Sequence, residues 1–359
     1  MQERCSALKT LFVVDTPSSA LHTSAYEWSK VIEGEILSAT NYYSLKHLLR
    51  DISSKKPELV IFSWRQLLDL VFLSPSNLEL FKTLTADSQI LALIADHSAE
   101  DSSRFEKDNR LAQVGVGLVP VTNRLFDFYT SRDLHPFGIL PDRPDINLIR
   151  SVRSECKSKV PNSIIWVGNS KWGKRHGFVD HKGLNLKYRP FLKLAQSSGI
   201  QFVSVIIDSA SQRKTQQEVL RNLASSEVLI VTSTSEGTGL PILEALGVGT
   251  NVLTTDVGVV REFPAVKIVA ADAEPREYLD AFVEWRKNRV SSEQCISEFE
   301  RYMSRIDNSW QLLIEKVRFS PNPQQNQLDL LEVGSKRVIN LLFWNLKFLL
   351  KWIRFCYDK

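Results

Sequence analysis

Short runs of apolar and β-branched residues alternate along the chain with segments of helical spacing. The runs contain too few polar residues for strands with one solvated face, and they fit parallel strands buried on both faces. Segments such as 188–198 and 217–224 have the spacing of amphipathic helices. The predicted strands are 11–14, 59–63, 90–95, 114–121, 163–167, 202–207, 228–232, 252–254 and 266–269. This alternation predicts βαβ units in doubly wound parallel sheets, an α/β fold.

The order of these elements and the chain length predict two domains. The 359 residues are enough for two cores of ordinary size. The segment 140–145, with two prolines and short acidic residues, is the best internal break, so we expect a Rossmann-like domain over 1–150 and a second over 151–319. Residues 320–334 begin with a polar, proline-containing stretch that reads as a linker, and 335–359 follow as a separate tail.

Charge is concentrated in the tail. Residues 335–359 carry six basic residues against Asp358, a net +5, whereas the whole chain has +4, so the other 334 residues sum to −1. A near-neutral body argues against a nucleic-acid partner. The first 17 residues do not resemble a signal peptide, and the chain has no uninterrupted run of 18 apolar residues. We therefore expect a cytoplasmic protein, with the tail as the part able to reach a membrane.

The tail reads as an amphipathic helix with a wide apolar face. On a helix, Lys336, Lys347, Lys351 and Arg354 fall in one narrow stripe, and the remaining surface is rich in Leu, Phe and Trp. That pattern is typical of a helix lying in the interface of an anionic membrane. The alternative is a terminal helix docked on the body or on a partner subunit. The polar linker before it favours the membrane, because it lets the tail act independently, and a cytoplasmic protein would meet that membrane at its cytoplasmic face.

The most informative stretch, 228–246, is an apolar strand, a Gly/Thr/Ser loop and a helix in succession. Gly237 and Gly239 let a ligand approach the backbone, and Pro241 suits the first helical turn. Free N–H groups at a helix start attract a phosphate, and Glu236 and Glu244 can accept hydrogen bonds from sugar hydroxyls. The residues thus indicate a phosphate-bearing, hydroxyl-rich ligand. An ordinary strand-to-helix turn with surface acids is the alternative.

Residues 228–262 resemble the donor-site signature of the family 4 retaining glycosyltransferases, also described as glycosyl transferases group 1. The family pattern is two glutamates eight positions apart around a G-x-G-L-P motif, which Glu236 and Glu244 reproduce, although Asn251 stands where the family usually has proline. The resemblance implies a GT-B fold, in which two Rossmann-like domains face each other across a cleft. It also implies that the helical stretch around 273–319 returns to the first domain.

The resemblance also implies roles for individual residues. Glu236 would contact the donor sugar, and Glu244 would hold the ribose hydroxyls of the nucleotide. The backbone lining the sugar and diphosphate would come from Gly237, Thr238, Gly239 and Leu240.

A second landmark follows the first strand of the C-terminal domain. The family has a G-R there and a K-G further on; this chain has Gly168, Asn169 and then Lys182-Gly183. Lys182 would neutralise diphosphate charge as the nucleotide leaves. Because Asn169 replaces the arginine, Lys171, Lys174 or Arg175 could supply the missing charge. A solvated basic loop is the alternative for all four cations.

The N-terminal domain resembles the family less. Its first strand is followed by a loop without glycine, and His97 stands where the family has a histidine that reaches the donor sugar. An ordinary histidine at a strand end is the alternative for His97. The other histidines, His181 among them, have no ligand spacing and are expected to be structural or exposed.

The resemblance implies retaining transfer of a sugar from a UDP- or GDP-sugar to a glycan or lipid-linked saccharide, with catalysis assigned to Glu236, Lys182 and His97. The family needs no metal or other cofactor, and its favoured mechanism is attack on the face that the leaving phosphate vacates. With the basic tail, synthesis of bacterial surface polysaccharide such as O-antigen, capsule or lipopolysaccharide is the expected setting. Two alternatives stay open: a non-catalytic GT-B partner subunit, which Asn169 and the glycine-free loop favour, and a sugar-nucleotide epimerase or hydrolase of the same fold.

Overall fold

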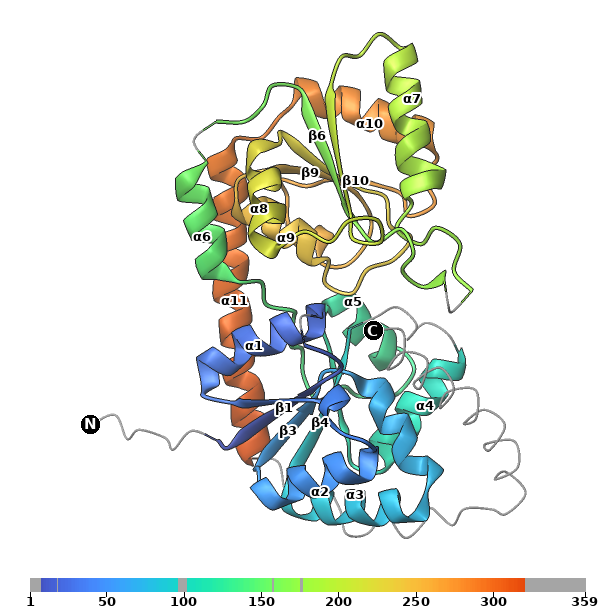
Figure 1. Cartoon of the computed structure of the whole chain (residues 1–359), viewed down its shortest axis with the longest axis vertical. Helices are drawn as coiled ribbons and strands as arrows, with labels where there is room; N and C mark the ends of the chain where they lie inside the picture. Colours follow the sequence, from blue (N-terminus) through green and yellow to red (C-terminus); the bar gives the residue numbers. More distant parts are fainter. Residues whose placement is uncertain (1–7, 18, 96–101, 157, 175–176, 320–359) are drawn as a thin grey trace. The chain divides into compact units, whose positions relative to one another are not determined.

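The computed structural model describes residues 8–17, 19–95, 102–156, 158–174 and 177–319. Contacts divide these residues into two compact units, and each contains one five-stranded parallel sheet flanked by helices (Figure 1). The first unit holds residues 8–93, 102–119 and 314–319, and the second holds 94–95 and 120–313. The predicted α/β class with two parallel sheets is confirmed. The predicted domain limits at 150 and 151 stay predictions.

The first sheet has the strand order β2-β1-β3-β4-β5. Its strands are β1 (Thr10–Val14), β2 (Glu35–Ser38), β3 (Leu59–Phe62), β4 (Gln89–Ile94) and β5 (Gly117–Pro120). The helices between them are α1 (Ala20–Ile32), α2 (Leu45–Lys55), α3 (Pro75–Asp87) and α4 (Ser102–Gln113), with the 3₁₀ turns η1 (Ala39–Asn41) and η2 (Arg65–Leu73). Strands β1, β3 and β4 are buried along their whole length, as their dense apolar runs predict.

Among the strands that the structure describes, β2 is the one that the apolar pattern did not predict. It pairs in parallel with β1 at the edge of the sheet, with Leu37 opposite Val13. Only Ile36 and Leu37 are apolar in its four residues, and Glu35 is exposed. An edge strand needs little burial, so its sequence carries little of the signal that marks the central strands.

The second sheet has the order β10-β9-β8-β6-β7. Its strands are β6 (Ser163–Gly168), β7 (Val203–Asp208), β8 (Val228–Val231), β9 (Asn251–Thr255) and β10 (Lys267–Val269). The helical elements that follow them are the π-helical turn η5 (Leu184–Tyr188), α7 (Arg189–Ser197), α8 (Gln216–Ser225), α9 (Leu240–Gly247), the 3₁₀ turn η6 (Val260–Glu262) and α10 (Pro275–Lys287). Trp166, Tyr188, Phe191, Tyr278 and Phe282 anchor the core between this sheet and its helices.

Both sheets use the same strand order. In each, the first strand lies between the second and the third, so the chain turns back across the sheet at one point. In the second sheet that point lies between β6 and β8, which pair directly through Ile164 and Val228. Ligands of open α/β sheets bind outside the carboxyl ends of the strands at such a switch point. The topology therefore indicates a ligand site at the loops that follow β6 and β8.

Three further helices complete the described chain: α5 (Asn123–Thr130), α6 (Ile146–Glu155) and the long α11 (Ser292–Phe319). The buried apolar residues of α11 form one stripe, most of them three or four positions apart. They are Cys295, Phe299, Tyr302, Met303, Ile306, Trp310, Leu313 and Val317. Residues 314–319 at the end of α11 belong to the first unit, although the helix begins in the second.

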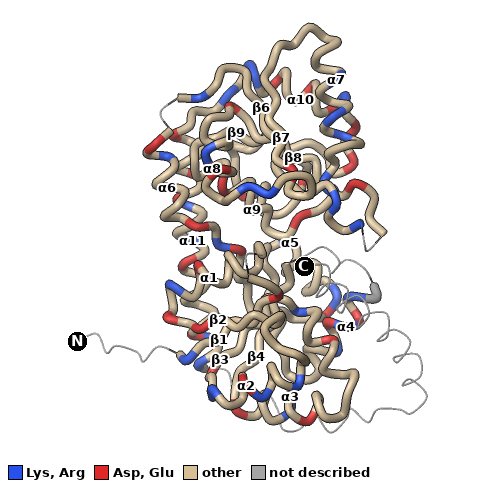
Figure 2. Tube along the Cα trace, in the orientation of Figure 1, with Lys and Arg blue, Asp and Glu red and all other residues tan. Residues whose placement is uncertain are grey.

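The linker 320–334 and the tail 335–359 lie outside the described residues, and so do His97 and Arg175. Among the helices that the structure describes, none is long and apolar enough to cross a membrane. Acidic and basic residues are interspersed along the described part of the chain (Figure 2).

A buried ionic cluster joins α4 to η2 in the first unit. Asp108 on α4 is fully buried and accepts a hydrogen bond from Arg104 Nε at 2.9 Å. Its Oδ1 also lies 3.3 Å from Nε of Arg65, whose side chain is 1% exposed. Arg104 donates in addition to Asp69 at 2.8 Å. Asp108 thus contacts both buried guanidinium groups, and Asp69 is a second partner of Arg104.

We expect Asp108→Ala to lower the free energy of unfolding by about 3–5 kcal/mol, because it removes the buried carboxylate that both guanidinium groups contact. Urea unfolding followed by circular dichroism measures this loss. Asp69→Ala is the matched control and should cost less, since the Asp69 side chain is 25% exposed. Equal losses in the two variants would contradict the assignment of Asp108 as the centre of the cluster.

Candidate functional site

The loop between β8 and α9 is built around glycines. Strand β8 is buried throughout, and residues 232–239 lead from it into α9. Gly239 caps the helix with a φ of 85°, a conformation that favours glycine, and it offers no side chain to the first-turn N–H groups. Pro241 stands in that turn, where its missing N–H costs nothing. The Ile242 N–H donates to the Gly239 carbonyl at 2.8 Å, so the Leu240 N–H is the donor that the first turn of α9 can offer to an anion.

The loop after β6 runs beside this one. A Cβ on Gly183 would lie 2.2 Å from the carbonyl oxygen of Thr232, so only glycine fits there, and its φ of +69° requires glycine as well. The Thr232 hydroxyl donates to the carbonyl of Lys182 at 2.8 Å and accepts from the indole of Trp166 at 3.1 Å. These contacts fix the backbone of Lys182 against the first residue after β8.

The two loops meet in an ion pair. Lys182 Nζ lies 2.5 Å from Glu236 Oε1, and the Ser233 hydroxyl donates to the same oxygen at 2.5 Å. Burial would raise the pKa of Glu236, but the charge of Lys182 and the two hydrogen bonds outweigh it, so the pKa lies below its usual value. The structure thus brings together the two residues to which the sequence assigns the sugar and the diphosphate.

His181 lies beneath this ion pair and was expected only to be structural or exposed. It is 4% exposed, and its Nε2 lies 3.1 Å from the carbonyl oxygen of Ser235. Trp172 and Phe178 cover the imidazole, with ring centroids 4.5 and 5.1 Å away. Burial and the charge of Lys182 lower the pKa of His181. No metal-ligand or catalytic spacing marked this histidine in the sequence; its position directly before Lys182 was the available signal.

Glu244 occupies a different environment. It is 7% exposed on α9 and accepts a hydrogen bond at 2.6 Å from the amide of Gln216, the first residue of α8. Burial raises its pKa to about 8, and the amide only partly offsets that effect. Gln216 is a site residue that sequence reasoning missed, because nothing in the α8 pattern distinguishes it from a solvated helix start.

Asp208 holds the loop segment that follows Asn169, the position at which the resembled family has an arginine. Asn169 follows Gly168 at the end of β6, and its Oδ1 accepts from the N–H of Lys171 at 3.0 Å. The carboxylate of Asp208, at the end of β7, accepts from the Ser170 N–H at 2.9 Å and from its hydroxyl at 2.7 Å. Asn169 therefore shapes the loop and supplies no charge for a phosphate.

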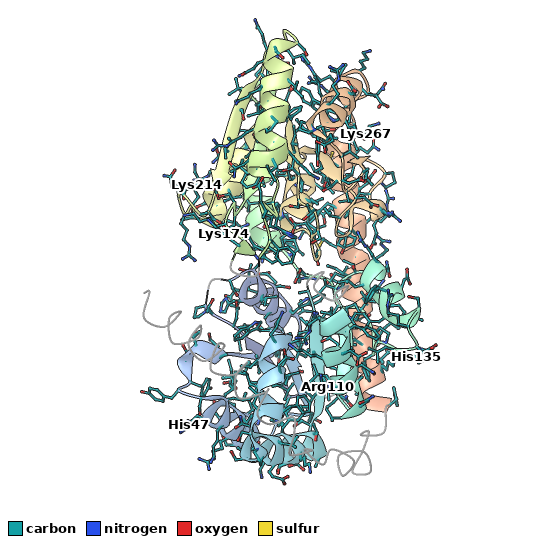
Figure 3. All side chains as sticks on the ribbon, turned by 90° about the vertical axis from the view of Figure 1, so that its right-hand side faces the viewer. His47, Arg110, His135, Lys174, Lys214 and Lys267 are labelled. Carbon is teal, nitrogen blue, oxygen red and sulfur yellow. The ribbon has the colours of Figure 1, made fainter. Side chains whose placement is uncertain are left out.

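Lysines lie in the loops that follow β6 and β7 at the carboxyl ends of these strands. Lys171 and Lys174 are exposed in the loop after β6, and Lys214 belongs to the loop after β7. Figure 3 shows Lys174 and Lys214 on the same side of the second unit. Lys171 is also close enough to Asp208 to contribute to the lowered pKa of that carboxyl. Arg175, the fourth candidate for the missing charge, lies outside the described residues.

Thr238 is held by contacts within the second unit. It is 1% exposed, and its hydroxyl oxygen accepts from the N–H of Asp142 at 3.2 Å. A Cβ on Gly258 would come within 2.3 Å of the Thr238 carbonyl oxygen. Close packing thus fixes the backbone between Gly237 and Leu240, the segment assigned to the sugar and diphosphate.

Within the residues that the structure describes, no group of three or more His, Cys, Asp or Glu side chains could hold a metal ion. His97, the third residue assigned to catalysis, is not among the described residues. The site that the structure does describe therefore consists of the loops after β6 and β8, the start of α9 and the pair Gln216–Glu244.

This loop–helix segment lies inside a region with a recognised family pattern. Residues 210–298 match the family model of glycosyl transferases group 1. The match covers the loop after β8, α9 and both glutamates, so the group 1 resemblance is confirmed for this region. The family 4 retaining subclass is a finer assignment that the match does not test. No curated protein matches the chain.

Solved structures of GT-B glycosyltransferases share the fold. The pneumococcal O-GlcNAc transferase GtfA, in complex with UDP and GlcNAc, is 15% identical, with a TM-score of 0.55 over 77% of this chain and 60% of its own. HepE from Anabaena, in complex with UDP, is 11% identical, with a TM-score of 0.56 over 87% and 100%. A UDP-forming α,α-trehalose-phosphate synthase from Burkholderia xenovorans is 9% identical, with a TM-score of 0.61 over 87% and 99%. At these identities the likeness shows the fold alone.

The raised pKa of Glu244 makes stability depend on pH. Its folded pKa of about 8 lies above the ordinary 4.5, so the folded state holds a proton that the unfolded chain releases between these values. The contribution of Glu244 is therefore fully present below about pH 4.5 and is lost as the pH rises to 8. Glu244→Gln removes this dependence.

We expect the melting temperature of Glu244→Gln, relative to that of the unchanged protein, to increase from pH 5 to pH 8.5. Calorimetric melting at several pH values measures the difference. Glu284→Gln, an exposed glutamate of the same unit, is the control and should show no such trend. A constant difference between Glu244→Gln and the unchanged protein would show that Glu244 is already ionised when folded.

Proposed function

We propose that this protein is a retaining glycosyltransferase that uses a nucleotide-sugar donor. The observation that carries the proposal is the Lys182–Glu236 pair, held at the switch point of the second sheet beside the start of α9. The group 1 match over residues 210–298 and the GT-B fold of the structural neighbours support it. HepE has been solved with UDP and with UDP-glucose, which favours a uridine nucleotide as the first donor to test, with GDP-sugars as the second choice.

The donor would lie with its diphosphate at the start of α9 and at Lys182. Its ribose hydroxyls would donate to Glu244, and its sugar would contact Glu236 and the backbone of 237–240. The pair with Glu236 orders the ammonium group of Lys182 within the protein itself. Ordering a charged side chain in advance lowers the entropy lost on binding.

Retention follows if the acceptor attacks the face that the leaving group vacates. The bond between the anomeric carbon and the phosphate oxygen breaks, the acceptor oxygen bonds to that carbon, and the acceptor proton passes to the departing phosphate. Negative charge on the diphosphate grows during this step, and Lys182 and the Leu240 N–H at the start of α9 would stabilise it. No protein nucleophile and no metal are part of the proposed reaction. His97 would contact the donor sugar.

The acceptor is proposed to be a glycan or a lipid-linked saccharide in the synthesis of bacterial surface polysaccharide. The support is the sequence of 335–359, whose basic and aromatic pattern fits an anionic membrane at the cytoplasmic face. The second candidate is a non-catalytic GT-B partner subunit. It is favoured by Asn169, which stands in the arginine position and has its side-chain oxygen engaged by the Lys171 N–H.

We expect calorimetry to detect binding of UDP or GDP and of the matching nucleotide sugar. Glu244→Ala should weaken binding about tenfold or more, because ribose donors favour the ionised carboxylate, and the ribose then loses a charge-assisted acceptor worth about 1.5–3 kcal/mol. Lys182→Ala should weaken the binding of ligands that carry a diphosphate by a comparable factor. Glu284→Ala is the surface control for both. Absence of binding by the unchanged protein would favour the non-catalytic partner-subunit candidate.

Vesicle sedimentation tests the proposal that residues 335–359 bind an anionic membrane. We expect the full chain to sediment with vesicles containing phosphatidylglycerol more than with phosphatidylcholine vesicles, and added salt should weaken the binding. Replacing Lys347, Lys351 and Arg354 together with Gln should lower the bound fraction, because each nearby cation contributes about 1 kcal/mol. Unchanged sedimentation in that variant would favour the docked or oligomeric tail.

A further inference from the structure

The imidazole of His181 bridges the two loops of the donor site. His181 belongs to the loop after β6, whereas both of its nitrogen partners belong to the loop after β8. Nδ1 lies 3.0 Å from the Thr234 hydroxyl, and Nε2 lies 3.1 Å from the Ser235 carbonyl oxygen. The backbone follows the same course, since the Thr234 N–H donates to the His181 carbonyl at 3.0 Å.

The partners of the ring fit a neutral imidazole. A carbonyl oxygen only accepts, so an Nε2 that bonds the Ser235 carbonyl carries a proton, and the Ser235 hydroxyl, 3.2 Å from the same nitrogen, can accept from it as well. Nδ1 can then accept from the Thr234 hydroxyl, which makes the neutral imidazole sufficient for both contacts. Burial and the adjacent Lys182 charge lower the pKa of His181, which agrees with a neutral ring.

Aromatic side chains keep water from the ring. His181 is 4% exposed, whereas the rings that cover it, Trp172 and Phe178, are 44% and 45% exposed. Lys182 Nζ lies 5.4 Å from the centroid of Trp172, so the same indole contacts both the imidazole and the ammonium group. Hydrogen bonds shielded in this way hold a loop more firmly than exposed ones.

We propose that His181 is a positioning residue that joins the loop 169–183 to the loop 232–239 and thereby places Lys182 for the donor diphosphate. The inference rests on the proposed function. Lys182 directly follows His181, and its ammonium group must meet a charge that grows as the sugar leaves. A small displacement of a charged group from its target weakens such stabilisation strongly.

The first experiment is a double-mutant cycle on the full chain, with UDP-glucose as the ligand in calorimetry. We expect His181→Ala to weaken binding about tenfold, the effect of losing one or two partly buried hydrogen bonds. If His181 acts through Lys182, adding His181→Ala to Lys182→Ala should cause little further loss. Fully additive losses would overturn the proposal, because they would mean that the two residues act independently.

Conservative variants separate positioning from general destabilisation. Gln at position 181 can offer an N–H near the Nε2 position, and Asn can offer an oxygen near the Nδ1 position. We expect His181→Gln and His181→Asn each to recover part of the affinity that His181→Ala loses. These two variants also carry the test if His181→Ala does not fold. Failure of both to exceed His181→Ala in affinity, with melting temperatures unchanged, would contradict the bridging role.

His135 supplies the matched control. It is an exposed histidine that Figure 3 shows away from Lys174 and Lys214, and His135→Ala should bind as the unchanged protein does. If the unchanged protein binds UDP-glucose and His181→Ala binds it equally well, the inference fails while the proposed function stands. If the unchanged protein binds neither UDP- nor GDP-sugars, the proposed function fails and the inference fails with it.

Discussion

The backbone at Gly183 packs directly on the carbonyl of Thr232, and the rest of the site depends on that contact. Lys182 precedes the glycine, and Glu236 stands four residues beyond the threonine. Their side chains therefore start from two loop segments whose backbones are already in van der Waals contact. A side chain at position 183 would separate the loops. The ion pair, the hydrogen bonds of His181 and the cover of Trp172 would then have no common support.

Two carboxylates near this contact have opposite electrostatic surroundings. Glu236 faces Lys182 and a hydroxyl, which keep its pKa low despite burial. Glu244 is the more deeply buried of the two, and its partner is the neutral amide of Gln216, so burial prevails and its pKa is raised. The first carboxylate is suited to ordering a cation. The second gains most from a ligand that donates hydrogen bonds, because such donors favour the ionised form.

The loop after β6 shows how a changed residue can keep a shape while losing a charge. Asn169 caps the turn that leads to Lys171, and Asp208 holds the neighbouring Ser170 through two hydrogen bonds. This arrangement leaves positive charge to residues further along the loop and to Lys182. A diphosphate bound here would therefore depend more on Lys182 and on the start of α9 than on the loop's first residues.

The sequence by itself determined the α/β class, nine of the ten strands in the described residues, and the strand–loop–helix segment that contains Glu236 and Glu244, because dense apolar runs and glycine positions are local signals. It did not reveal β2, whose edge position needs few apolar residues. Only the tertiary structure decided that Lys182 and Glu236 form a pair, that Gln216 meets Glu244, and that His181 reaches Ser235. Those contacts join residues far apart in the chain, and only the parallel pairing of β6, β7 and β8 brings their loops to one edge.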